Sequence, residues 1–511
     1  MKMKRFAALA LLCSLLLTAC AAPEQVALPT VTLPPAADDA AAPIGDAALT
    51  HTATFALYLP SRDGQRLICQ YASLTLNRGR HPAEAVARAL LEHPGDETVA
   101  PLGGNVTLRL NAGDPVELSG DVCTVNLMPS ALQLHHDDLY AACLALTTTL
   151  CELPGIRAVN VLVGGQAVGL DVADRLPLGS LSPHSGAELS ILWSQMAARR
   201  VPVGSDPADV PLTAAATLYY PLSTSNGIIP EARTLSFAGQ QPAQLIQTLL
   251  TALTIDPAQH PEAIALPNLS EMLTEPPTVA DLETGGRMAT LRFSAALTAA
   301  LERKGLDMAC FAASVTCTLT TFVPSLASVQ LIVGDQPVTN ASSQRMSSLI
   351  LPGGVARRAD FAAYIRAQAN VYLPQRGKLE AITRRLPDDD AYHPRALLLA
   401  LMAGPTDDER EAGVTPLLPE GLSDADILGI AVSGDTLLVN LSARAADRIR
   451  ESELDQHLMC RGLVSALCEL MKTPRVRFFF GSESVETLNG PIFWGGSFLY
   501  NPSLTQAAGG D

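Results

Sequence analysis

Three similar segments follow one another along this chain, and this repeat limits the possible fold more than any other feature of the sequence. Each segment opens with a short apolar strand that contains tyrosine and ends in proline. The three openings are Leu57-Tyr58-Leu59-Pro60, Leu218-Tyr219-Tyr220-Pro221 and Val371-Tyr372-Leu373-Pro374. They begin 161 and then 153 residues apart, which is the spacing of whole domains rather than of single hairpins.

Each segment continues with helical and strand patterns in the same order. An apolar helix that begins with proline, a residue suited to the first helical turn, is predicted at 82–92, 242–253 and 394–403. Glycine then marks a hairpin turn, at Ser119-Gly120-Asp121, at Gly286 and at Ser433-Gly434-Asp435. A second helix leads to a final strand, predicted at 159–163, 329–333 and 476–480, and each of these strands runs into a glycine.

The second helix gives the closest internal match. Residues 143–153 and 460–470 align without a gap. Cys143, Leu146, Leu150 and Leu153 recur at intervals of three and four residues, which is the pattern of one apolar face of a helix packed on a sheet.

The order of elements in one segment is therefore β-β-α-β-β-α-β. This order predicts the α+β class, with three tandem small domains that each have a mixed sheet and two helices on one face. We place domain 1 at 51–176, a divergent domain 2 at 213–340 and domain 3 at 370–490. Connectors at 177–212 and 341–369 hold one short helix each, at 188–199 and 358–368, and an aromatic tail follows at 491–511.

The N-terminus has the layout of a secretory signal. Lys2, Lys4 and Arg5 precede an apolar stretch that is too short for a good membrane span. The segment 1–20 ends in Leu-Thr-Ala-Cys and resembles a bacterial lipobox, which predicts lipidation of Cys20. Residues 21–50 are rich in alanine and proline, so we expect an extended tether. Two acyl chains on Cys20 suffice for stable anchoring at the extracytoplasmic face of the cell membrane.

Composition excludes some functions. A net charge of −16 argues against nucleic acid as a partner, because phosphate binding requires a basic surface. The ten cysteines include no CxxC pair. Cys143 and Cys151, like Cys460 and Cys468, are two helical turns apart, about 12 Å, which is too far for a disulfide. We interpret most of these cysteines as small buried thiols, while bridges between other pairs stay open.

We find no pattern of an enzyme, a metal site or a cofactor site. The cluster His135-His136-Asp137-Asp138 is the most metal-like, but it precedes a helix, where acidic residues favour the N-terminus. Residues 388–390 with His393 are interpreted as a solvated helix cap for the same reason. There is no serine elbow, zinc-protease motif or phosphate loop. We therefore predict no catalytic residue, no metal and no cofactor.

Few polar residues are shared between repeats, namely Glu152 with Glu469 and Asn126 with Asn440. The glutamates lie at helix ends, against the helix dipole, so one hypothesis is that they mark a contact surface. The aromatic stretch 489–502 has two interpretations. It is either an added edge strand that covers domain 3 or an exposed strand that binds a partner by β-augmentation.

The pattern resembles the sporulation and germination lipoproteins named GerM, whose repeat is called the GerMN domain. The resemblance rests on the opening strand, on a helix that runs into Gly404-Pro405, on the loop Pro419-Glu420-Gly421 and on the strand that contains Val439-Asn440-Leu441. Domain 3 matches best, domain 1 matches well and domain 2 diverges. The resemblance implies ring-building-like domains and a structural role in an envelope assembly, with protein partners and self-association.

Two functional hypotheses follow. The leading one is a non-enzymatic, lipid-anchored assembly or scaffold protein of the sporulation or germination envelope. The alternative is an extracytoplasmic regulatory or sensory lipoprotein that acts through a membrane partner, or a protein that binds or acts on peptidoglycan.

Overall fold

The computed structural model describes residues 40–501 except for 47–49, 78–80, 114, 154, 172, 174, 185, 224–226, 344–345, 347, 366–367, 387–392 and 472. The secretory signal, Cys20, residues 21–39 of the tether, residues 388–390 and the end of the aromatic tail lie outside the described residues.

Repeat 1 follows the predicted order of strands and helices. Its elements are β1 (Thr50–Pro60), β2 (Leu67–Asn77), α2 (Ala83–Leu91), β3 (Val116–Ser119), β4 (Val122–Leu127), η1 (Pro129–Gln133), α3 (His136–Leu150), β5 (Ala158–Val163) and β6 (Gln166–Ala167). The connector adds α4 (Leu189–Ala197) and η2 (Pro207–Asp209). The opening strand is longer than the sequence indicates, since β1 already begins within the predicted tether.

Repeat 2 has the same order with two more α-helices, α6 and α7. Its elements are β7 (Leu212–Pro221), β8 (Ile228–Phe237), α5 (Pro242–Ala252), α6 (Leu269–Met272), β9 (Thr278–Asp281), β10 (Arg287–Phe293), α7 (Ala296–Arg303), α8 (Met308–Phe322), β11 (Leu326–Val333) and β12 (Gln336–Pro337). The second connector contains β13 (Asn340–Ala341), β14 (Leu349–Ile350), η3 (Pro352–Gly354), β15 (Val355–Ala356), η4 (Arg358–Phe361) and α9 (Ala362–Ile365). The helix predicted at 358–368 is thus shorter, and Gln368 already belongs to a strand.

Repeat 3 closes the chain. Its elements are β16 (Gln368–Gln375), β17 (Lys378–Arg385), α10 (Pro394–Ala403), α11 (Asp407–Glu411), η6 (Asp424–Asp426), β18 (Ile427–Ser433), β19 (Thr436–Leu441), α12 (Ala443–Glu451), α13 (Gln456–Met471), β20 (Arg475–Phe480) and β21 (Ser497–Leu499). Helix α12, like α7, has no counterpart among the two predicted helices per repeat. Its sequence is mostly charged, and it buries only Ala445, Ala446 and Ile449.

The α+β class with tandem small domains is confirmed, but each repeat has two separate β layers. The first two strands form an antiparallel hairpin of their own: β1–β2, β7–β8 and β16–β17. The later strands form a mixed sheet in which the pairs β4–β5, β10–β11 and β19–β20 are parallel. The predicted single sheet is therefore divided into a hairpin and a smaller mixed sheet.

The long helix of each repeat lies between these two layers. Helix α8 contacts both β7 and β11, and every residue of it except Met308 is buried. Helix α8 is thus apolar or small on all sides, because both of its faces are covered. The apolar face predicted for 143–153 is buried as expected, and at 460–470 Arg461 remains exposed. A bond from the helix also ties it to the hairpin, since the backbone N–H of Tyr219 donates to Thr318 Oγ1 at 2.9 Å. Tyr58 N–H donates to Thr149 Oγ1 in the same way in repeat 1.

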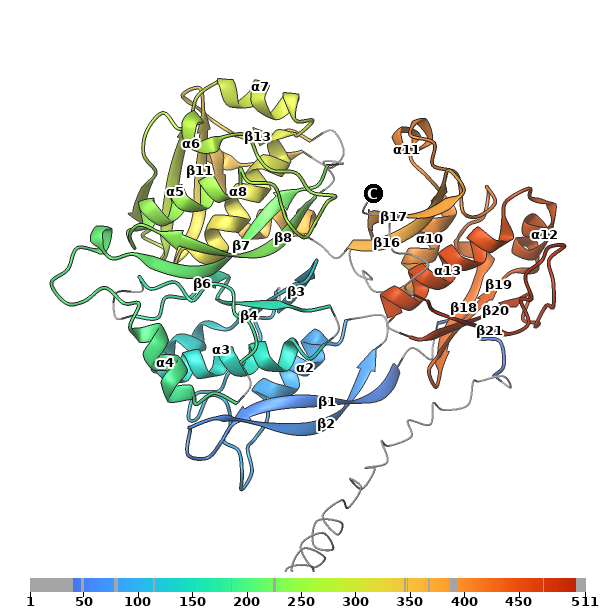
Figure 1. Cartoon of the computed structure of the whole chain (residues 1–511), viewed down its shortest axis with the longest axis horizontal. Coiled ribbons are helices and arrows are strands. Elements are labelled where there is room, and N and C mark those ends of the chain that lie inside the picture. Colours follow the sequence, from blue (N-terminus) through green and yellow to red (C-terminus); the bar gives the residue numbers. More distant parts are fainter. Residues whose placement is uncertain are drawn as a thin grey trace, which may run out of the picture.

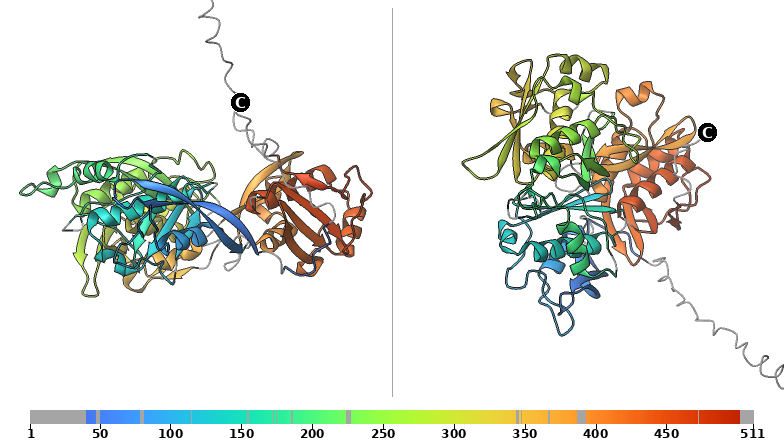
Figure 2. Two further views of the ribbon diagram at one scale, coloured as in Figure 1. Left: turned by 90° about the horizontal axis from the view of Figure 1, so that it is seen from below. Right: turned by 60° about the vertical axis from the view of Figure 1, so that its left-hand side comes forward.

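The three repeats make two lobes (Figures 1 and 2). One continuous hydrophobic core runs from Leu57 to Ile365 through repeats 1 and 2, and a second core fills repeat 3. Leu189, Met196 and Phe361 from the connectors belong to the first core. The predicted connectors are therefore packed parts of the first lobe.

Two threonines on α8 give a stability test. Thr318 and Thr316 are both fully buried. Thr318 accepts the Tyr219 N–H, whereas Thr316 Oγ1 has no hydrogen-bond partner among the described residues. Thr318→Val should lower the free energy of unfolding by about 1–3 kcal/mol, because it leaves a buried N–H unpaired. Thr316→Val should be neutral or stabilising. Chemical denaturation of both variants measures this, and equal losses would contradict the assignment.

Candidate functional site: the docking faces of the repeats

Repeat 2 docks its hairpin on the outer face of the repeat 1 sheet. In Figure 1, β7 lies between α8 on one side and the strands of repeat 1 on the other. A buried polar cluster joins the two layers. Asn160 Oδ1 accepts from Thr217 Oγ1 at 3.0 Å and from Ser180 Oγ at 2.9 Å, and Asn160 Nδ2 donates to Thr124 Oγ1 at 3.3 Å. These four side chains are less than a tenth exposed, so the cluster fixes how the two layers meet.

Close backbone contact surrounds this cluster. Ser180 N–H donates to the carbonyl oxygen of Ala215 at 2.9 Å. Gly179 has a φ of +72°, and a Cβ there would lie 2.3 Å from that same oxygen. Glycine is therefore required at 179 both for the backbone conformation and for the approach of β7.

An ion pair closes the next part of this interface. Arg358 Nη2 donates to Glu117 Oε1 at 2.7 Å and to Tyr219 Oη at 2.7 Å, and Arg358 Nη1 donates to Thr321 Oγ1 at 2.6 Å. The three partners come from the repeat 1 sheet, the repeat 2 hairpin and α8. Arg358 was predicted to lie in a connector, yet its side chain is only 11% exposed and joins all three elements. Breaking a buried pair of this kind costs more than forming it gains.

A histidine lies at the edge of the same interface. His260 Nδ1 is 3.3 Å from Glu262 Oε1, and His260 Nε2 is 3.8 Å from Asp121 Oδ1 of the repeat 1 hairpin turn. Burial by itself would lower the pKa of His260, but the two carboxylates outweigh it and raise the pKa to about 9. The imidazolium therefore lies between a carboxylate of each repeat at neutral pH.

This histidine predicts a pH-dependent interface. Its folded pKa is above the unfolded value of about 6.5. The protonated histidine thus contributes at most about 3 kcal/mol to the free energy of unfolding. This contribution is complete below about pH 6.5 and is lost as the pH rises through about 9. The difference in unfolding free energy between the native chain and His260→Gln should be largest at pH 6 and should shrink by pH 10. A difference that stays constant over this range would contradict the prediction.

Repeat 3 presents the same kind of outer sheet face, and a segment from far upstream lies on it. Asn440 Nδ2 on β19 donates to the carbonyl oxygen of Pro43 at 2.9 Å, and Gly45 N–H donates to the carbonyl oxygen of Leu428 at 2.8 Å. A Cβ on Gly429 would lie 2.5 Å from Pro43 O, so glycine lets the segment lie flat on β18. We call residues 43–46 the strap. This part of the predicted tether is held by the folded protein.

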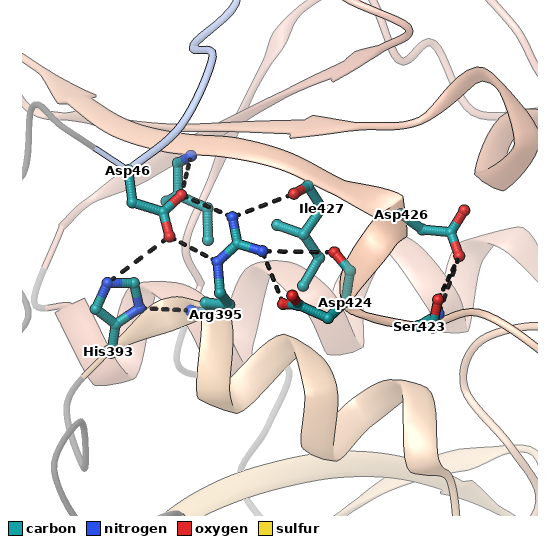
Figure 3. Close-up of polar contacts among 8 residues, drawn as sticks. Asp46, His393, Arg395, Ser423, Asp424, Asp426 and Ile427 are labelled. Carbon is teal, nitrogen blue, oxygen red and sulfur yellow. Dashed lines mark hydrogen bonds and ion pairs between the residues drawn. The ribbon is translucent and has the colours of Figure 1, made fainter.

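The strap ends in a carboxylate that an arginine holds with two hydrogen bonds (Figure 3). Arg395 Nε and Nη2 donate to Asp46 Oδ2 and Oδ1 at 2.6 and 3.0 Å. Asp46 Oδ1 also accepts from Ile430 N–H at 3.0 Å. Arg395 Nη1 donates to Asp424 Oδ1 at 2.8 Å, and the bonds to Asp46 and Asp424 raise the already high pKa of the guanidinium. Bidentate pairing is both stronger and more specific than a single bond.

His393 positions this arginine. It is the N-cap of α10, and its Nδ1 accepts from Arg395 N–H at 3.2 Å. Its Nε2 lies 3.9 Å from Asp46 Oδ2. The interpretation of His393 as a helix cap is thus confirmed, although its neighbours 388–390 lie outside the described residues.

The strap can be tested with matched arginine variants. Arg395→Gln removes both bonds to Asp46, so the amides of Gly45 and Ile430 should exchange hydrogen at least about tenfold faster, as expected for a local loss of 1.4 kcal/mol or more. Arg410→Gln is the control, because Arg410 forms an ion pair with Asp407 on the surface, and Asp407 is 94% exposed. Exchange followed by mass spectrometry measures this, and unchanged protection at both amides would argue against the clamp.

The shared polar residues have structural roles in both repeats. Asn126 Oδ1 accepts from Gly165 N–H at 2.9 Å, and Asn440 Oδ1 accepts from Ser482 N–H at 3.0 Å, so each closes the turn after the last strand. Tyr58 Oη donates to Glu152 at 2.9 Å, which raises the pKa of Tyr58 to about 12, and Tyr372 Oη donates to Glu469. The glutamates hold the opening strand to the second helix, which explains their recurrence without an outside partner.

The cluster around His135 lies on the surface at the start of α3. His135 is 76% exposed and contacts Asp137 at the start of α3, and the hydrogen bond to Asp137 raises the pKa of His135. In the described part of the chain no three side chains are grouped to hold a metal ion. All eight described cysteines are free, and six are buried; Cys69 is exposed and Cys151 is half-buried.

The aromatic segment near the C-terminus packs on repeat 3. Trp494 is fully buried and meets Phe478 and Phe480 edge-on at 5.5 and 5.7 Å. Strand β21 pairs antiparallel with β20. The interpretation of this segment as an edge strand that covers repeat 3 is confirmed over its described residues.

Within the described residues, no single helix is long and apolar enough to cross a membrane. The pair α7 and α8, bent by 101°, would pass by length and composition alone. Helix α8 is the buried centre of repeat 2.

Solved structures of other proteins match part of this chain. No curated protein matches it. The tandem GerMN domains of the sporulation protein GerM from Bacillus subtilis match 55% of this chain and 91% of their own, with 16% identity and a TM-score of 0.21. The first GerMN domain of that protein matches 24% and 90%, with 14% identity and a TM-score of 0.20. A putative lipoprotein from Clostridium perfringens matches 26% and 87%, with 18% identity and a TM-score of 0.18.

Repeat 3 carries the family match. Residues 370–486 match the family described as Germane, sporulation and spore germination. This segment includes α10, the Pro419-Glu420-Gly421 loop and the strand with Asn440, which are the features on which the resemblance rests. The family model thus matches repeat 3, and the resemblance to GerM-type sporulation and germination proteins is confirmed there.

Proposed function

We propose that this chain is a non-enzymatic, lipid-anchored assembly protein of an extracytoplasmic sporulation or germination complex. The observation that carries the proposal is the family match of residues 370–486. The docking of one repeat on another supports it, because the outer β faces of these domains serve as contact surfaces within the chain itself.

The roles of the recurring polar residues favour a scaffold over an enzyme. Asn126 and Asn440 close turns, and Glu152 and Glu469 hold tyrosines of the opening strands. A catalytic site inherited by both repeats would require shared polar groups that point into a common cleft. The shared groups instead make hydrogen bonds within their own repeat, and Asn440 also donates to the strap.

The membrane anchor is proposed from the N-terminal sequence. Cys20 follows an apolar stretch with a basic start, and two acyl chains are enough to hold a protein on a membrane. The chain would then face the extracytoplasmic side, with protein partners of the envelope and without nucleic acid. The net charge of −16 supports the proposal that nucleic acid is not a partner.

Removal of the anchor tests localisation. In the native host, Cys20→Ser should move most of the chain from the membrane fraction to the soluble or unprocessed fraction, because the thiol is the lipidated atom. Cell fractionation with an antibody measures this shift. Cys69→Ser is the control and should leave the distribution unchanged.

Deletion of the gene tests the biological role. Heat-resistant spores, or their germination rate, should fall at least about tenfold, and the wild-type gene should restore them. Normal spore numbers and normal germination in the deletion strain would reject the sporulation role. A growth-phase envelope defect in that strain would instead favour the regulatory or peptidoglycan-binding alternative.

A further inference from the structure

The hairpin of repeat 1 presents an open face with the same chemistry as the docked hairpin of repeat 2. Residues of the docked face are Thr213, Ala215, Thr217, Tyr219, Pro230, Ala232, Thr234 and Ser236. The matching positions of repeat 1 are Thr52, Thr54, Ala56, Tyr58, Cys69, Tyr71, Ser73 and Thr75. Both sets consist of small, β-branched or aromatic side chains without a charge. We call the second set the open hairpin face.

The two faces differ in what covers them. On the docked face, Thr217, Tyr219 and Pro230 are buried under the repeat 1 sheet, whereas Thr213, Thr234 and Ser236 at the other end of the hairpin are exposed. On the open hairpin face, Tyr71 is 77% exposed, and Cys69 and Ser73 are exposed as well. A broad uncharged face with an exposed tyrosine is typical of a surface that binds another protein.

The mixed sheet of repeat 2 presents the complementary surface. In repeat 1 the docking sheet carries Thr124 and Asn160 opposite each other on the parallel pair, joined by a hydrogen bond. Repeat 2 has Thr290 and Gln330 at the corresponding pair, and Thr290 Oγ1 donates to Gln330 Oε1 at 3.4 Å. Thr290 and Gln330 are only half-buried, whereas Thr124 and Asn160 are buried.

The edge of this sheet also corresponds. Glu117 pairs with Thr124 across β3 and β4 and contacts the tyrosine of the docked hairpin. Thr278 pairs with Thr290 across β9 and β10 in the same way, and Thr278 is exposed. Gln330 Nε2 also donates to the carbonyl oxygen of Gly353 at 3.0 Å, so its amide is already fixed in place. Thr278, Thr290 and Gln330 thus form the open sheet face of repeat 2.

We propose that the open sheet face of repeat 2 in one molecule docks on the open hairpin face of repeat 1 in a second copy. The contact repeats between molecules the arrangement that joins repeats 1 and 2 within one. Because the two faces are different surfaces, the contact is heterologous, and copies add head to tail into a ring or a filament. The sheet face of repeat 3 does not take part in this contact, because the strap already lies on it.

This inference deepens the proposed assembly role but stands on its own contacts. Localisation and spore counts test the proposed function, whereas association between copies tests the docking. If the chain were found away from the membrane, the crosslinking experiment described below could be done on the soluble chain, and it would still show whether copies dock.

The native chain supplies a reporter for the experiment. Among the described cysteines, Cys69 on the open hairpin face is exposed, Cys151 is half-buried and the rest are buried. Thr278→Cys adds a second reactive thiol on the open sheet face. The full chain with Thr278→Cys, in the membranes of producing cells, is treated with a short bismaleimide and separated by denaturing electrophoresis.

The expected result is a ladder of dimers, trimers and larger species, because each molecule carries one thiol on each face. The native chain and the variant with both Thr278→Cys and Cys69→Ser should give no ladder. Tyr71→Arg added to Thr278→Cys should remove at least about nine tenths of the ladder, since it places a charge in the contact. Ile255→Arg is the matched control, because Ile255 is 56% exposed and lies on neither face, and it should leave the ladder intact.

Two results would overturn the proposal. Absence of crosslinked species with Thr278→Cys, when both thiols react with a monofunctional maleimide, would show that the faces do not meet. Dimers in the native chain through Cys69 alone would show that two hairpins pair with each other, which is an isologous contact and cannot extend into a ladder.

Discussion

The burial of one long helix between two β layers is the constraint on which the rest of this structure depends. Helix α8 is covered by strands on both sides. A helix with one face in solvent carries charged side chains on that face, whereas α8 has Ala, Ser, Thr and Cys there, packed against strands. Both outer surfaces of such a repeat are β surfaces. A chain of these repeats therefore joins by placing one sheet face on the next hairpin face, as repeats 1 and 2 do through Asn160 and Thr217.

The polar groups at these faces decide how the layers meet more than how strongly they adhere. The shared core of repeats 1 and 2 supplies the apolar burial. Arg358, Glu117 and the Asn160 cluster add groups that must be paired once buried, so any shifted arrangement would leave one of them without a partner. In the middle repeat, Thr321 on α8 stands where Glu152 and Glu469 stand in the others, and it accepts a hydrogen bond from Arg358 at this interface.

Local patterns in the sequence predict the elements, and contacts between distant residues explain what they miss. The helices that begin at Pro242 and Pro394 are predicted at their first residue, and the turns at Gly120 and Gly434 are found where predicted. These features depend on one residue and its neighbours. The separation of the hairpin from the mixed sheet depends on which strands pair, and the burial of Arg358 depends on Glu117, which is 241 residues away. Neither the strand pairing nor the burial of Arg358 can be predicted from the local spacing of residues in the sequence.

The clamp at Asp46 shows the same limit and changes how the anchor is understood. Arg395 and Asp46 are 349 residues apart, so no local pattern could pair them. The strap lies on repeat 3, and the chain then continues into β1 of repeat 1. If Cys20 carries a lipid, a force applied at the anchor would act on repeat 3 before repeat 1, because the hydrogen bonds of Arg395 and Asn440 to the strap would bear this force first. The membrane would then hold the family-matched domain, while the two open faces of the first lobe remain available to other copies.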